Sequence, residues 1–275
     1  MTVINTNINS LAAQGAMNLH GRDLSRSMAQ LSSGLRINSA ADDAAGLAIG
    51  NKLNTQIRSL DMSVRNANDA ISMLQTADGS TNEISAMLFR MRELAVQSAN
   101  DTYGTSERTV LNNEFGQLQE QITAVLSNSQ WNGMNLLDGT AGSSGTVKYQ
   151  VGASANDTIE TTFSNLGSGD MATALSATID SHTASQSSLT SIDAAIKQVD
   201  SSRSQWGAVI NRLTHAADNS SNVSLNSSAS RSQIMDTDYA QATAELARSM
   251  ILDQAGKAML SQANQQPYYV LALLS

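Results

Sequence analysis

Apolar residues recur in alternating steps of four and three along much of this 275-residue chain. This spacing places them on one face of an α-helix and is typical of helices that pack along a shared seam. Two segments in the first half carry it and one in the second, so the two halves must pack together to bury their seams. We therefore predict a mainly α-helical fold whose body is a long antiparallel helical bundle or coiled coil. The predicted seam residues are Leu53, Ile57, Leu60, Val64, Ala67, Ile71, Leu74, Ile84, Leu88, Met91 and Ala95, then Leu111, Phe115, Leu118, Ile122 and Val125, and finally Leu189, Ile192, Ile196, Val199, Arg203, Trp206, Ile210, Leu213 and Ala217.

The composition agrees with long helices. Proline, which interrupts helices, occurs once, at Pro267, and aromatic residues make up only 4% of the chain. A compact protein of this size normally draws on aromatic bulk for its core. The single charged seam residue, Arg203, is suited to fixing the register between helices.

The middle of the chain has a different pattern. Asn132-Gly133 and Asp138-Gly139 are turn signals. Apolar and polar residues alternate over 147–151 and again over 159–163, on either side of a loop at 152–158. This alternation predicts a β-hairpin within residues 139–170. The Ser-, Thr- and Gly-rich stretch 164–188 is expected to be surface loop with room for one short helix.

The two ends of the chain carry apolar residues with no evident partner. Residues 270–274 read Val-Leu-Ala-Leu-Leu, whereas chain ends are usually polar and frayed. Ordering costs about 1–2 kcal/mol per residue, so such a tail needs a partner. Capping patterns at 39–42 and 236–238 separate terminal helices, residues 1–40 and 236–275, from a bundle over 41–235. We expect the terminal helices to pair and to mediate self-assembly through Ile4, Ile8, Leu11, Leu24, Met28, Leu31, Leu35, Leu246, Met250, Leu260, Leu271 and Leu274.

Several classes of function are disfavoured. A net charge of −8 argues against a nucleic-acid partner. No run of 18 apolar residues could span a membrane, and the first thirty residues lack the pattern of a cleavable signal. The chain has no cysteine, and its three histidines show no metal-ligand spacing. We find no catalytic constellation, so we expect a protein that is not an enzyme and has no cofactor.

Several long motifs resemble those of bacterial flagellins. They are Ile4–Asn7, Ser32–Ile49, Met91–Asn100, Gln254–Gly256 and Gln262–Gln265, and the resemblance covers both terminal arms and most of the bundle. It implies a minimal flagellin, without large outer domains, that polymerises into the extracellular filament used for motility. The terminal helices would form the inner tube of the filament and the bundle its outer tube. Export would run through the flagellar type III system.

The resemblance also implies partners. These are other copies of the chain, an export chaperone that holds the C-terminal helix, the filament cap and the hook-junction proteins. It further implies recognition by Toll-like receptor 5, with the family's positions carried over to Arg90, Leu94 and Glu114. The simpler reading of these three residues is that they serve subunit packing.

Two alternatives remain open at this point. One is a hook–filament junction protein, which shares the terminal arms, although the length and the intact Arg90–Asn100 stretch favour the main filament. The other is an amphipathic lipid-binding helical protein, whose helices would carry Lys/Arg-rich polar faces and bulky aromatics. These helices have neither feature.

Overall fold

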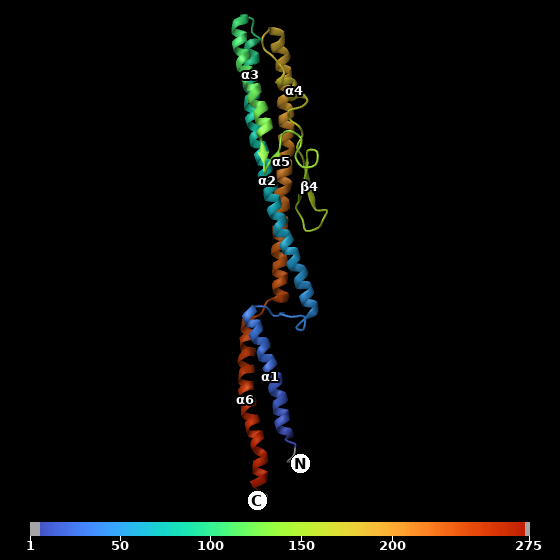
Figure 1. The fold of residues 1–275 in the computed structure, drawn as a ribbon, viewed down its shortest axis with the longest axis vertical. Helices are drawn as coiled ribbons and strands as arrows, with labels where there is room; N and C mark the ends of the chain where they lie inside the picture. Colours follow the sequence, from blue (N-terminus) through green and yellow to red (C-terminus); the bar gives the residue numbers. More distant parts are fainter. Residues whose placement is uncertain (1–5, 273–275) are drawn as a thin grey trace. The chain divides into compact units, whose positions relative to one another are not determined.

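The computed structural model describes the backbone of residues 6–272 and the side chains of residues 6–266. It is mainly helical, as predicted, and divides into two compact units (Figure 1). One comprises residues up to 55 together with those from 226 onward, and the other comprises residues 56–225. The division predicted at residues 40 and 236 stays a prediction. Among the described residues, none of the helices is sufficiently long and apolar to cross a membrane.

The unit formed by residues 56–225 is built on the three predicted seams. α2 (Ala44–Ser98) and α5 (His182–Met235) supply two of them and α3 (Thr105–Asn128) the third. Cross-helix contacts show that α2 and α5 run antiparallel, because rising numbers on α2 meet falling numbers on α5. These contacts are Asp61 with Ser224 at 2.9 Å, Asp78 with Arg203 at 2.7 Å and Arg92 with Asp193 at 2.7 Å.

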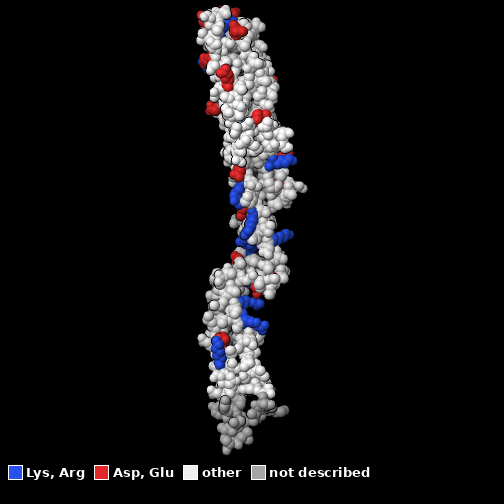
Figure 2. All heavy atoms as spheres, viewed as in Figure 1, with Lys and Arg blue, Asp and Glu red and all other residues white. Residues whose placement is uncertain are grey.

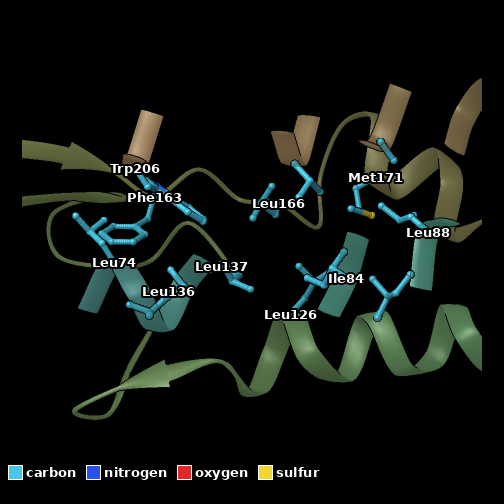
Figure 3. Packing of buried hydrophobic residues seen from close by; sticks show 14 of the residues in the cluster. Leu74, Ile84, Leu88, Leu126, Leu136, Leu137, Phe163, Leu166, Met171 and Trp206 are labelled. Carbon is cyan, nitrogen blue, oxygen red and sulfur yellow. The ribbon is translucent and has the colours of Figure 1, made fainter. Parts of the chain in front are cut away.

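Most of the predicted seam residues of this unit form its core, whereas Val64 is half-buried and Arg203 pairs with Asp78. Figure 3 shows side chains from α2, α3 and α5 converging with residues of the intervening segment. The indole of Trp206 is buried beside the ring of Phe163, with centroids 5.7 Å apart, and donates from Nε1 to the Thr162 carbonyl. Fully buried residues here include Leu74, Ile84, Leu88, Phe115, Ile122, Leu136, Leu137 and Leu166.

The intervening segment contains the predicted hairpin and a second one. β3 (Thr146–Gln150) pairs antiparallel with β4 (Thr158–Thr162), with Thr146 opposite Thr162 and Gln150 opposite Thr158. β1 (Gln130–Trp131) and β2 (Met134–Asn135) form a smaller hairpin around the Asn132-Gly133 turn, where both residues have positive φ. Only the turn of this smaller hairpin was predicted. The one short helix is α4 (Asp170–Leu175).

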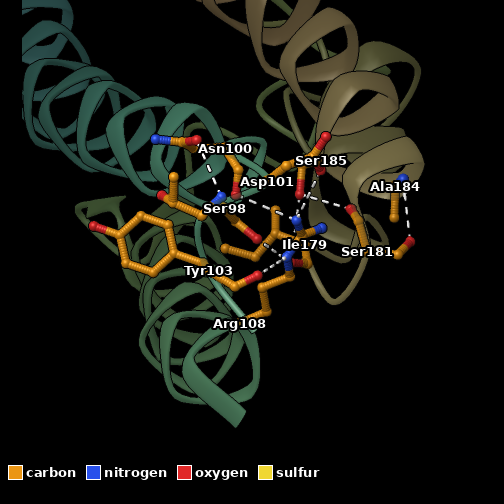
Figure 4. Close-up of polar contacts among 10 residues, drawn as sticks. Ser98, Asn100, Asp101, Tyr103, Arg108, Ile179, Ser181, Ala184 and Ser185 are labelled. Carbon is orange, nitrogen blue, oxygen red and sulfur yellow. Dashed lines mark hydrogen bonds and ion pairs between the residues drawn. The ribbon is translucent and has the colours of Figure 1, made fainter. Parts of the chain in front are cut away.

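A polar cluster closes the turn between α2 and α3 (Figure 4). The Arg108 side chain is buried and donates to the carbonyls of Tyr103 and Asn100 and to the Asp101 carboxylate. The Ser98 hydroxyl donates to the carbonyl of Ile179, just before α5. These bonds satisfy backbone groups left over at the helix end, so the cluster has a structural role.

In the other unit, α1 (Ile8–Ser33) packs against α6 (Tyr239–Ala272). The predicted cap before α6 is confirmed, since Asp238 Oδ1 accepts from the Ala240 N–H. Before α2 the cap is Asp43, one residue beyond the predicted 39–42, and its Oδ1 accepts from the Gly46 N–H. Asp42 instead accepts from the N–H and hydroxyl of Ser39. The two connecting segments are also bonded to each other. The Arg36 N–H donates to the Met235 carbonyl at 2.7 Å, and the Thr237 N–H donates to the Gly34 carbonyl at 2.9 Å.

Candidate assembly surfaces

Several small side chains lie in the contact between α1 and α6. Ser10 and Ser27 of α1 and Ser249 of α6 are buried. Gly256 lies so close to Met17 that an added Cβ would be 3.0 Å from the Met17 Cγ. The helices can therefore approach closely at these positions.

Near residue 7 the contact becomes polar. The Asn7 amide donates to the Ala263 carbonyl at 2.7 Å, and the Ser10 hydroxyl donates to Asn264 Oδ1 at 2.8 Å. The Asn9 amide reaches Gln266 Oε1 at 2.9 Å. These bonds set the register of α1 against α6 without using the apolar residues of either helix.

The apolar side chains of α1 lie largely outside this contact. Ile8, Leu11 and Leu19 are all more than half exposed. At about 100° per residue they cluster on the side of α1 opposite to Ser10 and Ser27. This outward stripe on α1 has no cover within the described part of the chain.

α6 carries exposed apolar residues on sides that α1 leaves free, among polar ones. Met250, Ile251 and Leu252 are consecutive and exposed, and Ile251 is 66% exposed. Three consecutive residues sweep about 200° of a helix circumference, while Ser249 and Gly256 face α1 on the remaining side. An exposed apolar run of this kind typically marks an interaction surface.

The residues predicted to mediate assembly differ in how exposed they are. Ile8, Leu11, Met28 and Met250 are exposed. The half-buried ones are Leu24, Leu31, Leu35, Leu246 and Leu260. Ile4, Leu274 and the side chain of Leu271 lie outside the described residues. The predicted residues of α1 do not share one face of the helix. Leu11 and Leu24 are 13 residues apart, which turns the direction of their side chains by about 220°.

On α1 and α6, sequence reasoning missed five large apolar residues that are exposed in the described part of the chain: Leu19, Tyr239, Ile251, Leu252 and Met259. The apolar run 250–252 carried a signal, since three successive apolar residues cannot all belong to one seam. A search restricted to steps of three and four passes over such a run.

The three positions carried over for receptor recognition differ in their exposure to solvent. Arg90 donates to Glu114 Oε1 at 2.8 and 2.9 Å and to Glu93 Oε2 at 3.1 Å, and the side chains of Arg90 and Glu114 are about half exposed. The hydrogen bonds that Arg90 donates to Glu114, and then to Glu93, raise the pKa of Arg90. Leu94 is fully buried in the bundle core, so its side chain is not on the surface.

A shallow groove lies beside this ion pair on α2. Phe89 and Val96 are each about half exposed, and with Arg92, Glu93 and Gln97 they line a hollow of about 610 Å³. Elsewhere the visible face is mostly uncharged, with acidic side chains gathered toward the end of the bundle where α2 passes into α3 (Figure 2). Among the described residues, no group of His, Cys, Asp and Glu is arranged to hold a metal ion.

Comparison with known proteins gives matches along nearly the whole chain. Residues 4–142 match the model of the bacterial flagellin N-terminal helical region, and residues 189–274 match that of the C-terminal helical region. The chain is 45% identical over 273 residues to a flagellin of Halalkalibacterium halodurans, covering 99% of both proteins. It is 37% identical over 303 residues to a Bacillus subtilis flagellin, covering 98% of this chain and 99% of that protein.

Solved structures are similar in fold. A crystal structure of Bacillus cereus flagellin matches with a TM-score of 0.52 at 30% identity, covering 57% of this chain and 88% of that one. A Vibrio parahaemolyticus protein described as hook-associated matches with a TM-score of 0.62 at 15% identity, covering 71% of this chain and all of that one. The latter likeness concerns the fold alone.

Proposed function

Because this chain belongs to the bacterial flagellin family, the structural, non-enzymatic subunits of the extracellular flagellar filament, we propose that the exposed faces of α1 and α6 join its copies in the polymer. The observation that carries this proposal is the distribution of apolar residues around α6. α1 covers one side of α6, which leaves Met250, Ile251 and Leu252 to be covered by other molecules.

Burial of these faces favours assembly. Fully burying one Leu, Ile or Met side chain contributes roughly 1.5–3 kcal/mol. The exposed apolar residues of α1 and α6 therefore contribute to association if neighbouring copies supply matching faces. This contribution works against the entropy of ordering the arms and of fixing one subunit against the next.

Substitution of Ile251 by Glu tests the proposal. A carboxylate cannot be buried unpaired, so Ile251→Glu should raise the critical concentration for polymerisation at least tenfold while leaving the helical content of the free subunit unchanged. The matched control is Gln254→Glu, which adds the same charge at an exposed polar position of α6. Sedimentation and electron microscopy give the readout. Normal filaments from Ile251→Glu would contradict the proposal.

The remaining partners are proposed on the family resemblance. They are an export chaperone that shields the apolar C-terminal helix, the filament cap at the growing end and the hook-junction proteins. Export through the flagellar type III system belongs to the same proposal. A lipid-binding role is disfavoured because the described part of α6 has only two cations, Arg248 and Lys257, and they are balanced by Glu245 and Asp253, whereas membrane-surface helices carry Lys- and Arg-rich polar faces.

We also propose that free subunits are recognised by Toll-like receptor 5 through Arg90 and Glu114. Their half-exposed ion pair supports this, because both partners can hydrogen-bond a second protein. Leu94 would act indirectly, by holding α2 in the bundle core. A receptor reporter assay should show reduced signalling for Arg90→Ala and unchanged signalling for Arg65→Ala, another exposed arginine on α2. An inactive wild type would refute the proposal.

A further inference from the structure

Methionine is the sulfur-containing residue type of this chain, which has twelve methionines and no cysteine. Among the methionines that the structure describes, four thioethers are substantially exposed: Met28 at 54%, Met62 at 46%, Met250 at 44% and Met259 at 62%. Others lie in the bundle core, where Met91 and Met171 are fully buried. Oxidation of methionine follows exposure, so an oxidant reaching the free subunit meets the first group before the second.

Three of the four exposed thioethers lie on the surfaces proposed for assembly. Met28 is on α1, and Met250 and Met259 are on α6. We propose that Met28, Met250 and Met259 form an oxidation-sensitive modification site, at which hydrogen peroxide converts free subunits into a form that cannot polymerise. This inference rests on the proposed function, since it requires these faces to become buried between copies.

The chemistry is a two-electron oxygen transfer. A lone pair of the thioether sulfur attacks one peroxide oxygen, the O–O bond breaks, and the remaining hydroxide takes up the proton of the transferred oxygen and leaves as water. Sulfur is oxidised to the sulfoxide, and peroxide is reduced to water. Methionine sulfoxide reductases reverse the change, so the site can be restored.

Oxidation should prevent assembly because it makes these apolar side chains polar. The sulfoxide oxygen is a strong hydrogen-bond acceptor on a side chain that was apolar. In an apolar contact between helices it would be buried without a donor, which is unfavourable. Once subunits are assembled, the same burial shields the sulfur from peroxide. Oxidation and assembly are therefore mutually exclusive at these three positions.

Limited peroxide treatment of the full-length subunit tests this. Peptide mass spectrometry should find sulfoxide at Met28, Met250 and Met259 in free protein, little at the same residues in preformed filaments, and none at Met91 or Met171 in either. Treated subunits should give at least tenfold less filament than untreated ones. Sulfoxide reductase should restore the yield.

Two variants locate the effect. The triple substitution Met28→Leu, Met250→Leu, Met259→Leu conserves side-chain volume and should polymerise equally well with and without peroxide. Met62→Leu removes a comparably exposed thioether from α2 and should stay as sensitive as the wild type. Sensitivity that follows Met62 and not the other three would overturn the inference.

The outcomes separate the two proposals. If untreated wild type does not polymerise, the proposed function fails. If untreated and fully oxidised subunits polymerise alike, only the present inference fails. Should the triple variant not assemble at all, reductase treatment of oxidised wild type decides: recovery of polymer supports the site, and no recovery overturns it.

Discussion

Two glycines show how different the demands on a single residue are in this molecule. Gly207 lies inside α5, and a Cβ added there would meet nothing within 4 Å. Gly145 has φ +83°, and a Cβ there would lie 2.7 Å from the Phe163 carbonyl oxygen. Gly207→Ala should stabilise the subunit by about 0.5–1 kcal/mol through helix propensity. Gly145→Ala should destabilise it by about 1–3 kcal/mol. Urea unfolding followed by circular dichroism measures both, and equal effects would contradict this account.

The carboxylate of Asp138 should make the stability of the folded subunit depend on pH. Its Oδ1 accepts from the Thr140 hydroxyl and N–H, and its Oδ2 from the Asn135 amide. The Thr140 hydroxyl is the largest cause that lowers the pKa of Asp138 below its ordinary 3.8. A lowered folded-state pKa means that the stabilisation is complete above the unfolded pKa and is lost as pH falls through the folded one.

The corresponding experiment compares wild type with Asp138→Asn. The wild type should be the more stable near neutral pH, and its advantage should shrink as the pH drops below about 4. Thr140→Val, which keeps the N–H donor and loses the hydroxyl, should bring the Asp138 pKa back toward its ordinary value in an NMR titration. A wild-type advantage that grows in acid would refute the assignment.

At the scale of elements, the β3–β4 hairpin is attached to the bundle by a few inward side chains. Phe163 follows β4 and is buried against Trp206 of α5, whereas the preceding Thr162 is exposed. Phe163→Ala should therefore cost about 3–5 kcal/mol. Thr162→Ala should stay within about 0.5 kcal/mol. Thermal unfolding and the near-ultraviolet signal of the tryptophans report the difference, and a similar loss in both variants would argue against this mode of attachment.

For the whole molecule, the two units should differ in local stability. Residues 56–225 have a continuous apolar core, whereas the contact between α1 and α6 includes buried serines, a glycine and asparagine side chains beside its half-buried leucines. Amides of α1 and α6 should exchange with solvent much faster than those in the middle of α2 and α5 in the free subunit, and should slow on polymerisation. Hydrogen exchange with mass spectrometry measures this. Equal protection before assembly would show that the arms are stable alone.

The elements that could be predicted from the sequence are those whose apolar repeat extends over many residues. The seams of α2, α3 and α5 were predictable because residues such as Leu74 and Leu88 repeat over many turns. The β1–β2 hairpin was not, because two-residue strands show no alternation. The faces of α1 and α6 were only partly predictable: which apolar residues turn outward depends on where small residues such as Ser10 and Gly256 permit close contact. Leu94 was assigned from resemblance, although it lies in the same helical run as the buried Met91 and Ala95.

The bonded connections between the helices have a mechanical consequence. Gly34 and Arg36 on one strand are tied to Thr237 and Met235 on the other by backbone hydrogen bonds. Pulling either segment along its length therefore requires shearing it past the other and breaking these bonds, so each segment resists extension of its neighbour.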